Sequence, residues 1–226
     1  GNMRLAAYPP GKGDITNMIR SYIHRCQKDG VKIVMNCEVT PELIKEEKPD
    51  SVIIATGSKT LILPIEGIDN PAIIHGSDLL DGKRPAGKKV LVVGGGMVGC
   101  ETAAFLGEQE HDVTVIEFRD TVGADVIHEH RVYLMKDFED YGIKEITGAK
   151  VCKFYEDGVE YETADGVRHE TRGYDSVILS MGFRNYNPLE EKIKDLVRET
   201  HVIGDAIRAR RALDATKEAY EVASRL

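Results

Sequence analysis

The sequence lacks long apolar runs and blocks of basic residues. No apolar run approaches the length of a transmembrane helix, and the first residues do not have the charged-then-apolar pattern of a secretory signal. The chain has 38 acidic and 30 basic residues, a net charge of −8. Nucleic acid and anionic membranes are therefore poor candidates for partners. We expect a cytoplasmic protein with no membrane or nucleic-acid partner.

The four cysteines are too scattered for a disulfide framework or a metal site. Cys26, Cys37, Cys100 and Cys152 form no C-x-x-C pair, so we expect reduced thiols and no metal site. Cys100 stands where a helix N-terminus can lower a thiol pKa, but we expect it to be a small packing residue. In His128-Glu129-His130 the two histidines diverge on a helix, which favours polar surface residues over metal ligands.

The chain does contain a glycine-rich turn that directly follows a short apolar strand. Residues 90–93 are apolar and mostly β-branched, as expected of a parallel strand covered on both faces. Gly94, Gly96 and Gly99 follow in G-x-G-x-x-G spacing. In that order they permit the tight turn, the approach of a pyrophosphate to the backbone, and close helix–strand packing. The helix that begins there directs its free N–H groups and positive dipole end at the phosphates.

A second strand and a terminal acid strengthen this pattern. Residues 113–116 form another apolar run that ends at Glu117, eighteen residues after Gly99. A carboxylate near this spacing accepts a hydrogen bond from an adenosine ribose 2′-OH. It also repels a 2′-phosphate and so favours NAD, whereas Arg119 could accommodate NADP. The pattern predicts dinucleotide binding; the alternative is a strand–helix turn whose glycines are incidental.

The rest of the chain indicates an α/β protein whose length allows one large or two modest domains. Two Asp-Gly turns predict an antiparallel β-meander. The expected elements are helices over 14–27, 40–48, 124–141 and 212–226, strands over 31–35, 51–55, 174–180 and 201–205, and the meander over 150–169.

The order of these motifs resembles the two-dinucleotide-binding flavoprotein oxidoreductases, in which an NAD(P)-binding domain is inserted into an FAD-binding domain. Two strands end alike at 54–57 and 179–182, the glycine turn lies between them, and Ile203-Gly204-Asp205 comes last. More narrowly, residues 5–12, 64–68 and 204–210 look like the C-terminal part of the NADH:flavin oxidoreductase family. This family contains 2,4-dienoyl-CoA reductase, 2-enoate reductase and trimethylamine dehydrogenase.

The resemblance implies a domain plan. A Rossmann-type three-layer NAD(P)-binding domain with a β-meander would occupy 86–188, after a connector over 58–85. Remnants of an FAD-binding α/β domain would occupy 1–57 and 189–226. The first FAD glycine motif, an FMN barrel and the cysteine cluster for an iron–sulfur centre do not occur in the sequence. We therefore expect a fragment, inactive alone, whose partner is an N-terminal barrel domain of the same enzyme.

The resemblance also implies a reaction: hydride passes from NAD(P)H to FAD, and electrons then reach FMN through the iron–sulfur cluster to reduce an activated C=C bond of enoate or enoyl-CoA type. Hydride transfer needs no protein acid or base at the reacting carbon, so we assign no catalytic residue. The residues expected to contact cofactors are Gly94, Gly95, Gly96, Met97, Val98, Gly99, Glu101, Glu117, Arg119, Gly182, Thr56, Gly57, Gly204 and Asp205.

Among these, Glu101 is expected near the nicotinamide and the flavin, and Asp205 near the ribityl–pyrophosphate part of FAD. Each has a simpler interpretation. Glu101 would lie in the first turn of a helix, where the helix dipole stabilises an acid without any ligand. Asp205 would simply cap a helix. Two functions of other classes also stay open: a stand-alone non-catalytic NAD-binding or redox-sensing module, and a doubly wound transferase that binds another adenosine ligand.

Overall fold

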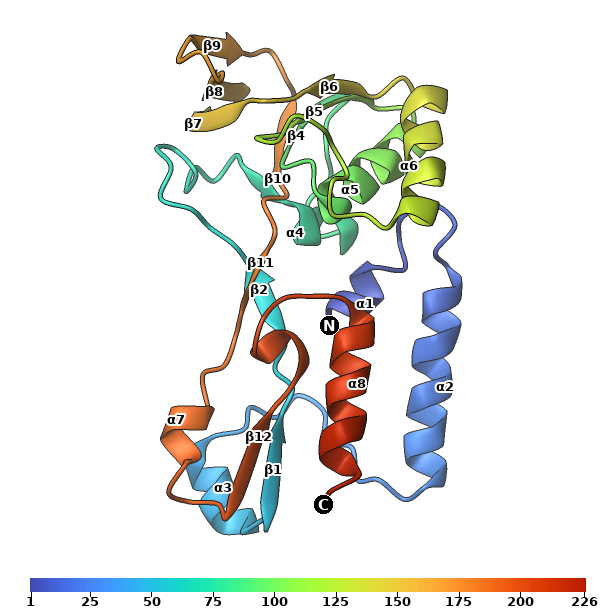
Figure 1. Ribbon diagram of the computed structural model, residues 1–226, viewed down its shortest axis with the longest axis vertical. Coiled ribbons are helices and arrows are strands. Elements are labelled where there is room, and N and C mark those ends of the chain that lie inside the picture. Colours follow the sequence, from blue (N-terminus) through green and yellow to red (C-terminus); the bar gives the residue numbers. More distant parts are fainter. The chain divides into compact units, whose positions relative to one another are not determined.

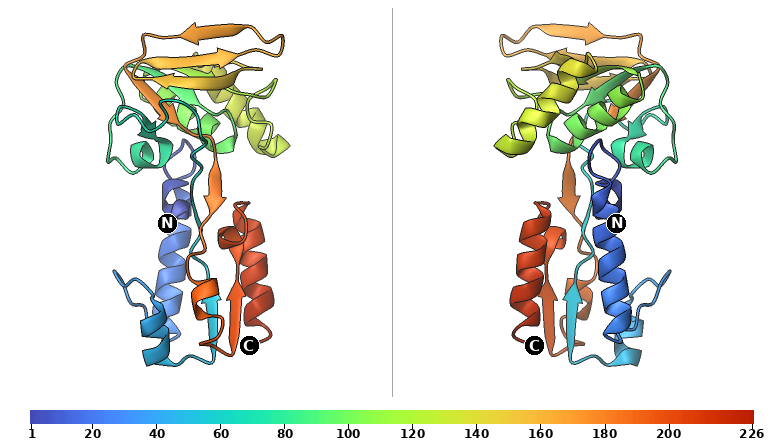
Figure 2. Two further views of the ribbon diagram at one scale, coloured as in Figure 1. Left: turned by 90° about the vertical axis from the view of Figure 1, so that its left-hand side faces the viewer. Right: turned by 90° about the vertical axis from the view of Figure 1, so that its right-hand side faces the viewer.

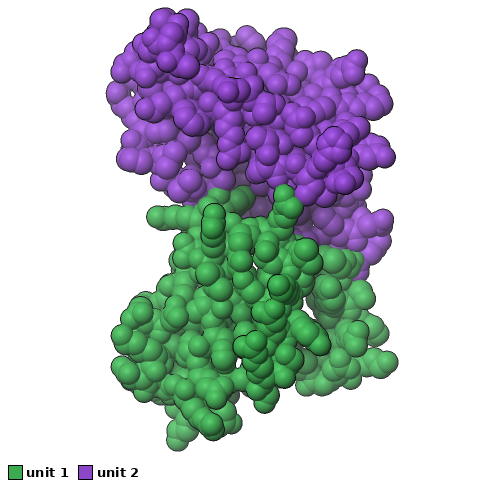
Figure 3. All heavy atoms as spheres, viewed as in Figure 1, with its two compact units in different colours: residues 1–2, 18–59, 183–226 green, residues 3–17, 60–182 purple.

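The computed structural model describes residues 1–226, which group into two compact units, coloured separately in Figure 3. Unit 1 comprises residues 1–2, 18–59 and 183–226, and unit 2 comprises residues 3–17 and 60–182. The chain thus enters unit 1 more than once, and the two units are described in turn. None of the helices combines the length and the apolar character needed to cross a membrane.

Unit 2 is built on a five-stranded parallel sheet (Figure 1). Its strand order is β3 (Ile74–His75), β10 (Ser176–Leu179), β4 (Lys89–Val93), β5 (Asp112–Ile116) and β6 (Lys144–Ile146). The helices of this unit are α4 (Gly76–Leu80), α5 (Met97–Glu108) and α6 (His128–Asp140). Helix α1 (Asn2–Leu5) begins in unit 1 and continues into unit 2.

Each face of this sheet is covered by a different layer. Side chains alternate along a strand, so Val90 and Val92 of β4 pack into one core with α5 and α6. Leu91 and Val93 point the other way, into a core with Phe154 and its neighbours. Residues 90–93 of the central strand are buried, as the continuous apolar run predicts for a parallel sheet.

The second covering layer is the predicted antiparallel meander (Figure 2). It consists of β7 (Lys150–Tyr155), β8 (Gly158–Glu162) and β9 (Arg168–Thr171). The β7–β8 register shifts between Val151 and Lys153, a bulge that bends one strand. Helices, parallel sheet and meander form three layers, so the predicted Rossmann-type α/β fold is confirmed.

Unit 1 has a smaller sheet, in which β1 (Ser51–Ile54) pairs parallel with β12 (Glu199–Val202). Around it lie most of α2 (Asp14–Lys28), and α3 (Pro41–Glu47), α7 (Glu190–Ile193), the 3₁₀ turn Gly204–Ala206 and α8 (Ala212–Ala223). Its core contains Ile44, Ile54 and Ile193. Thr40 caps α3 as predicted and accepts a hydrogen bond from the Leu43 amide at 3.3 Å.

Three expectations differ from the structure. The strand predicted over 31–35 does not form: the segment pairs with no other strand and its side chains are exposed. The segment 58–85, expected as a connector, contributes β3 and α4 to unit 2, and β2 (Ser58–Thr60) pairs with β11 (Phe183–Asn185). Residues 3–17 were expected to belong to the FAD-binding remnant over 1–57, but they group with unit 2. There Arg4 forms an ion pair with Asp81 at 2.5 Å.

Candidate functional site

The turn between β4 and α5 has little room for side chains. Gly94 has φ of +106°, a conformation that favours glycine, and its amide donates to the Ile116 carbonyl at 2.9 Å. A β-carbon on Gly99 would lie 1.8 Å from the Gly94 carbonyl oxygen, and one on Gly94 would lie 2.5 Å from the Ser180 carbonyl oxygen. The first and third glycines of the motif are therefore required by close packing between α5 and the sheet.

The second glycine leaves the start of α5 open to a ligand. Gly96 is the N-cap residue and supplies no side-chain cap. One of the first amides of α5, that of Met97, donates to Asp125 Oδ1 at 2.9 Å. Asp125 comes from the loop before α6 and lies 3.3 Å from the position of a Gly96 β-carbon. An internal carboxylate thus already uses part of the anion-binding capacity of this helix end.

Glu117 is fixed to the same turn. Its Oε2 accepts a hydrogen bond from the Gly95 amide at 2.6 Å, and its Oε1 accepts one from the Arg119 amide at 3.0 Å. Hydrogen bonds to a carboxylate are stronger than neutral ones, so the acid at the end of β5 is held in place. Each oxygen keeps lone pairs for a further donor, which is what a ribose hydroxyl requires.

A cavity of about 300 Å³ opens beside this turn. Seven of the residues predicted from the sequence line it: Gly94, Gly96, Met97, Val98, Glu117, Arg119 and Gly182. Gly95 and Gly99 lie behind this surface, where they hold Glu117 and pack the helix. The sequence interpretation missed Asp125 and Ser180, which also line the cavity. Ser180 Oγ is buried without a hydrogen-bond partner and lies 2.7 Å from the position of a Gly76 β-carbon, beneath the surface of the cavity.

Glu101 lies in α5 outside this cavity lining and has two cationic neighbours. It is 6% exposed, its Oε1 accepts a hydrogen bond from Lys12 Nζ, and His130 Nε2 lies 3.8 Å from the same oxygen. Lys12 comes from the segment before α2 and His130 from α6, so no local spacing signals the cluster. His130, expected to be a polar surface residue, is a partly buried neighbour of this carboxylate.

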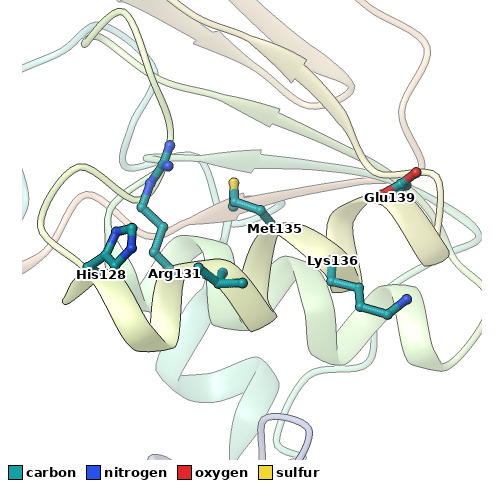
Figure 4. Close-up of a pocket in the computed structure, with 6 residues that line it drawn as sticks. His128, Arg131, Met135, Lys136 and Glu139 are labelled. Carbon is teal, nitrogen blue, oxygen red and sulfur yellow. The ribbon is translucent and has the colours of Figure 1, made fainter.

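A larger hollow of about 520 Å³ lies along α6. Figure 4 shows that its side chains fan out from one helix, and all six lining residues, His128 to Glu139, belong to α6. A single helix face cannot surround a ligand, whereas the turn after β4 supplies backbone donors and an acid. The cavity at the glycine turn is therefore the better candidate site.

The other predicted residues lie in unit 1, apart from this cavity's lining. Thr56 Oγ1 donates to the Tyr186 carbonyl oxygen, and the Gly57 carbonyl accepts from the Tyr186 amide at 2.9 Å. Asp205 accepts hydrogen bonds from Ser58 Oγ at 2.9 Å and from the Arg210 amide at 3.0 Å. Gly204 has φ of +61°. The contacts of Asp205 organise the turn after β12, whereas those of Thr56 and Gly57 join the segment after β1 to the segment after β11.

Cys100 belongs to α5 and is fully buried in the core between this helix and the sheet. Burial raises the pKa of its thiol to about 12, and Sγ lies 3.2 Å from the Gly95 carbonyl oxygen. At neutral pH the thiol stays protonated and unreactive. This supports the interpretation of Cys100 as a packing residue.

Comparison with known proteins assigns the family. The family model described as "Pyridine nucleotide-disulphide oxidoreductase" matches residues 11–204, a span that contains the glycine turn and both β1 and β12. The chain belongs to this family. In this pyridine nucleotide-disulphide oxidoreductase chain all four cysteines are free.

Several relatives of this oxidoreductase chain are named reductases or oxidases. The NADH oxidase of Thermoanaerobacter brockii is 31% identical over 99% of the chain and 35% of its own length. The cinnamate reductase of Clostridium sporogenes is 29% identical over 100% of the chain and 34% of its own length. A solved 2-naphthoyl-CoA reductase in complex with 2-naphthoyl-CoA superposes with a TM-score of 0.94, at 30% identity, over 100% of this chain and 34% of that chain. The chain thus spans about a third of the length of these relatives.

Proposed function

We propose that this chain is the nicotinamide-nucleotide-binding part of a flavin-dependent oxidoreductase of the NADH:flavin oxidoreductase type, which includes 2,4-dienoyl-CoA reductase. It would accept NAD(P)H so that hydride passes to FAD, for eventual reduction of an activated C=C bond in the full-length enzyme. The observation that carries the proposal is the cavity beside the β4–α5 turn, where backbone donors and Glu117 converge.

The residues of unit 2 fit a dinucleotide. The absence of a β-carbon at Gly96 leaves the start of α5 open to a pyrophosphate, for which the amides after it are donors. Glu117 Oε1 or Oε2 would accept a hydrogen bond from the adenosine ribose. Glu117 favours NAD over NADP; Arg119, also at the cavity, leaves NADP as the second choice.

The protein's part in the chemistry is to bind and orient. A bound nicotinamide supplies the hydride, and no side chain has to move a proton at the reacting carbon. Glu101, anchored by Lys12, would orient the nicotinamide ring. In this proposal the glycine turn places the dinucleotide and the layers on both sides of the sheet keep the turn rigid.

The flavin is assigned to the full-length protein. Unit 1 would contribute Thr56, Gly57, Gly204 and Asp205 as part of an FAD-binding domain, but no strand of unit 1 is followed by a glycine-rich phosphate turn. These residues alone do not fit FAD. The relatives named above are about three times longer than the chain, which supports a partner N-terminal domain that would hold FMN and an iron–sulfur cluster.

Titration of the chain with NADH, followed by the quenching or enhancement of NADH fluorescence, tests the proposal. We expect saturable binding that weakens at least about tenfold in Gly96→Val, whose side chain would intrude on the pyrophosphate position. Gly13→Ala, where a β-carbon meets nothing within 4 Å, should bind like the unmodified chain. Equal binding by Gly96→Val, or no binding at all, would contradict a dinucleotide site at this turn.

A second measurement separates the enzyme from a non-catalytic NAD-binding or redox-sensing module. NADH oxidation is followed with the protein extended to the length of its relatives and with added FAD. Turnover supports the flavin-dependent oxidoreductase. NADH binding without turnover in the extended protein favours the module.

A further inference from the structure

The cluster of Lys12, Glu101 and His130 in unit 2 combines a buried carboxylate with two cationic groups. Both cations approach the same oxygen: Lys12 Nζ hydrogen-bonds to Glu101 Oε1, and His130 Nε2 lies 3.8 Å from it. Glu101 Oε2 accepts no hydrogen bond from another residue, although the side chain is only 8% exposed. A nearly buried carboxylate normally uses its acceptors, so Oε2 is available to a ligand.

The three groups differ in how their charge responds to pH. Lysine and glutamate side chains ordinarily stay charged across the neutral range, whereas histidine ordinarily changes charge between about pH 5 and 8. The charges of Lys12 and Glu101 cancel, so the cluster is neutral when His130 is neutral and carries one positive charge when His130 is protonated. The His130 side chain is 29% exposed, which gives solvent protons access to it.

The two redox forms of a nicotinamide differ by one charge at the ring: the reduced ring is neutral and the oxidised ring is cationic. A positive charge beside the ring therefore weakens binding of the oxidised form and leaves the reduced form nearly unaffected. At a partly solvated site one unit charge a few ångströms away changes affinity several-fold.

We propose that His130 is a positioning residue that, with Lys12, holds Glu101 and makes the site discriminate between reduced and oxidised nicotinamide according to pH. This inference rests on the proposed function, in which Glu101 faces the nicotinamide. On acidification the cluster favours NADH over NAD⁺, so the oxidised product leaves more readily.

Other charged groups also lie near His130, and the comparison of variants described below separates their effects from that of His130. Across from it lie Glu101 of α5 and Lys12. On its own helix Asp137 senses the charge of His130, and burial raises the pKa of the Asp137 carboxyl. Titration of Asp137 at the acid end is shared by all the variants, so a comparison between them isolates His130.

The test is the ratio of the dissociation constants of NAD⁺ and NADH from about pH 5.5 to about pH 8.5. A general loss of stability moves both constants together and cancels in the ratio. In the unmodified chain we expect the ratio to rise about three- to tenfold on acidification. In His130→Gln the ratio should stay, at every pH, at the low value that the unmodified chain has at alkaline pH. In His130→Lys the ratio should stay high at every pH. His128→Gln, on the exposed side of α6, is the matched control and should behave like the unmodified chain.

The outcomes separate the two proposals. A constant ratio in the unmodified chain, or a rise that persists in His130→Gln, overturns this inference and leaves the proposed function intact when NADH binds. If the unmodified chain binds NADH at no pH, the proposed function fails and the role of His130 fails with it. The His130→Lys variant keeps the test decisive if His130→Gln does not fold.

Discussion

The amide nitrogen of Gly95 lies 2.6 Å from Oε2 of Glu117. This hydrogen bond joins the glycine turn after β4 to the acid at the end of β5, two strands that are also paired along their whole length. The acid expected to receive a ribose is therefore part of the turn's own architecture. Substitution of Glu117 should therefore affect both the stability of the fold and the preference between NADH and NADPH.

Glu117→Ala removes the acceptor of the Gly95 and Arg119 amides. We expect the free energy of unfolding of unit 2 to fall by about 1–3 kcal/mol, the usual cost of unpaired amides, and the preference for NADH over NADPH to shrink about tenfold. Urea unfolding and paired titrations measure these effects. Glu108→Gln, an exposed acid on α5, is the control. An unchanged nucleotide preference would exclude Glu117 from the ribose site.

Gly99→Ala should be among the most damaging single changes. A β-carbon there would lie 1.8 Å from the Gly94 carbonyl oxygen, which belongs to the backbone and cannot turn away. We expect a loss of more than about 3 kcal/mol or failure to fold, measured by thermal unfolding. Gly13→Ala meets no atom within 4 Å and should melt like the unmodified chain. A stable Gly99→Ala protein would show that α5 can shift away from the sheet.

The contribution of Cys100 to the free energy of unfolding should depend on pH in the alkaline range. Burial raises the pKa of its thiol to about 12, above the ordinary value of about 8.5. The folded state therefore keeps a proton that the unfolded chain loses, and the contribution of Cys100 to stability is complete below about pH 8.5 and is lost as pH rises toward about 12.

We expect Cys100→Ala to reduce the loss of stability between about pH 8 and about pH 10.5, measured by urea unfolding at both values. Alkylation followed by mass spectrometry gives an independent check. Exposed Cys37 should be labelled in the folded protein and Cys100 only after unfolding. Rapid labelling of Cys100 in the folded state would contradict its burial.

Asp125 should oppose anion binding at the glycine turn. Its Oδ1 accepts a hydrogen bond from the Met97 amide at 2.9 Å, where a pyrophosphate would gain from the helix dipole. Asp125→Asn keeps an acceptor but removes the charge. We expect NADH to bind about three- to tenfold more tightly, measured by fluorescence titration. Asp120→Asn, an exposed acid of the same loop, should change affinity little. Weaker binding by Asp125→Asn would mean that the carboxylate supports the ligand.

Glu218 connects α8 to the turn after β12 in unit 1. A hydrogen bond from Arg210, and then one from the Gly204 amide at 2.7 Å, lower the pKa of the Glu218 carboxyl. A carboxyl with a lowered pKa contributes stability that is complete above its ordinary value of about 4.3 and is lost as pH falls below it. We expect Glu218→Gln to be less stable than the unmodified chain at neutral pH and the difference to shrink on acidification. Acid titration of the circular dichroism signal measures this; a difference that is independent of pH would contradict it.

The predictions from the sequence were most accurate for features that depend only on residues close together in the chain. The apolar run of β4, the spacing of the glycines and the Asp-Gly turns of the meander specify elements within a few residues, and each element forms as predicted. Thr40 and Pro41 likewise begin α3 through a cap that needs only neighbouring residues. The predicted roles of the fourteen cofactor residues stay predictions, for which the cavity provides the tests.

Where the prediction was wrong, the deciding partner lies far away in the chain. Residues 31–35 have the composition of a strand, yet a strand needs a neighbour to satisfy its backbone groups, and no strand pairs with them in this chain. The reverse holds for residues 74–75, which are too few to signal a strand but pair with β10.

A strand, a glycine turn, a helix and an acid suited to a dinucleotide can be recognised from the amino-acid sequence alone, because these features depend on spacing within about thirty residues. Which charged groups meet at that helix depends on how the chain folds in three dimensions. Lys12 and His130 reach Glu101 from 89 residues before it and 29 residues after it. Asp125 reaches the Met97 amide from the loop before α6. Such contacts arise from the packing of whole layers on the sheet, and no local pattern encodes them.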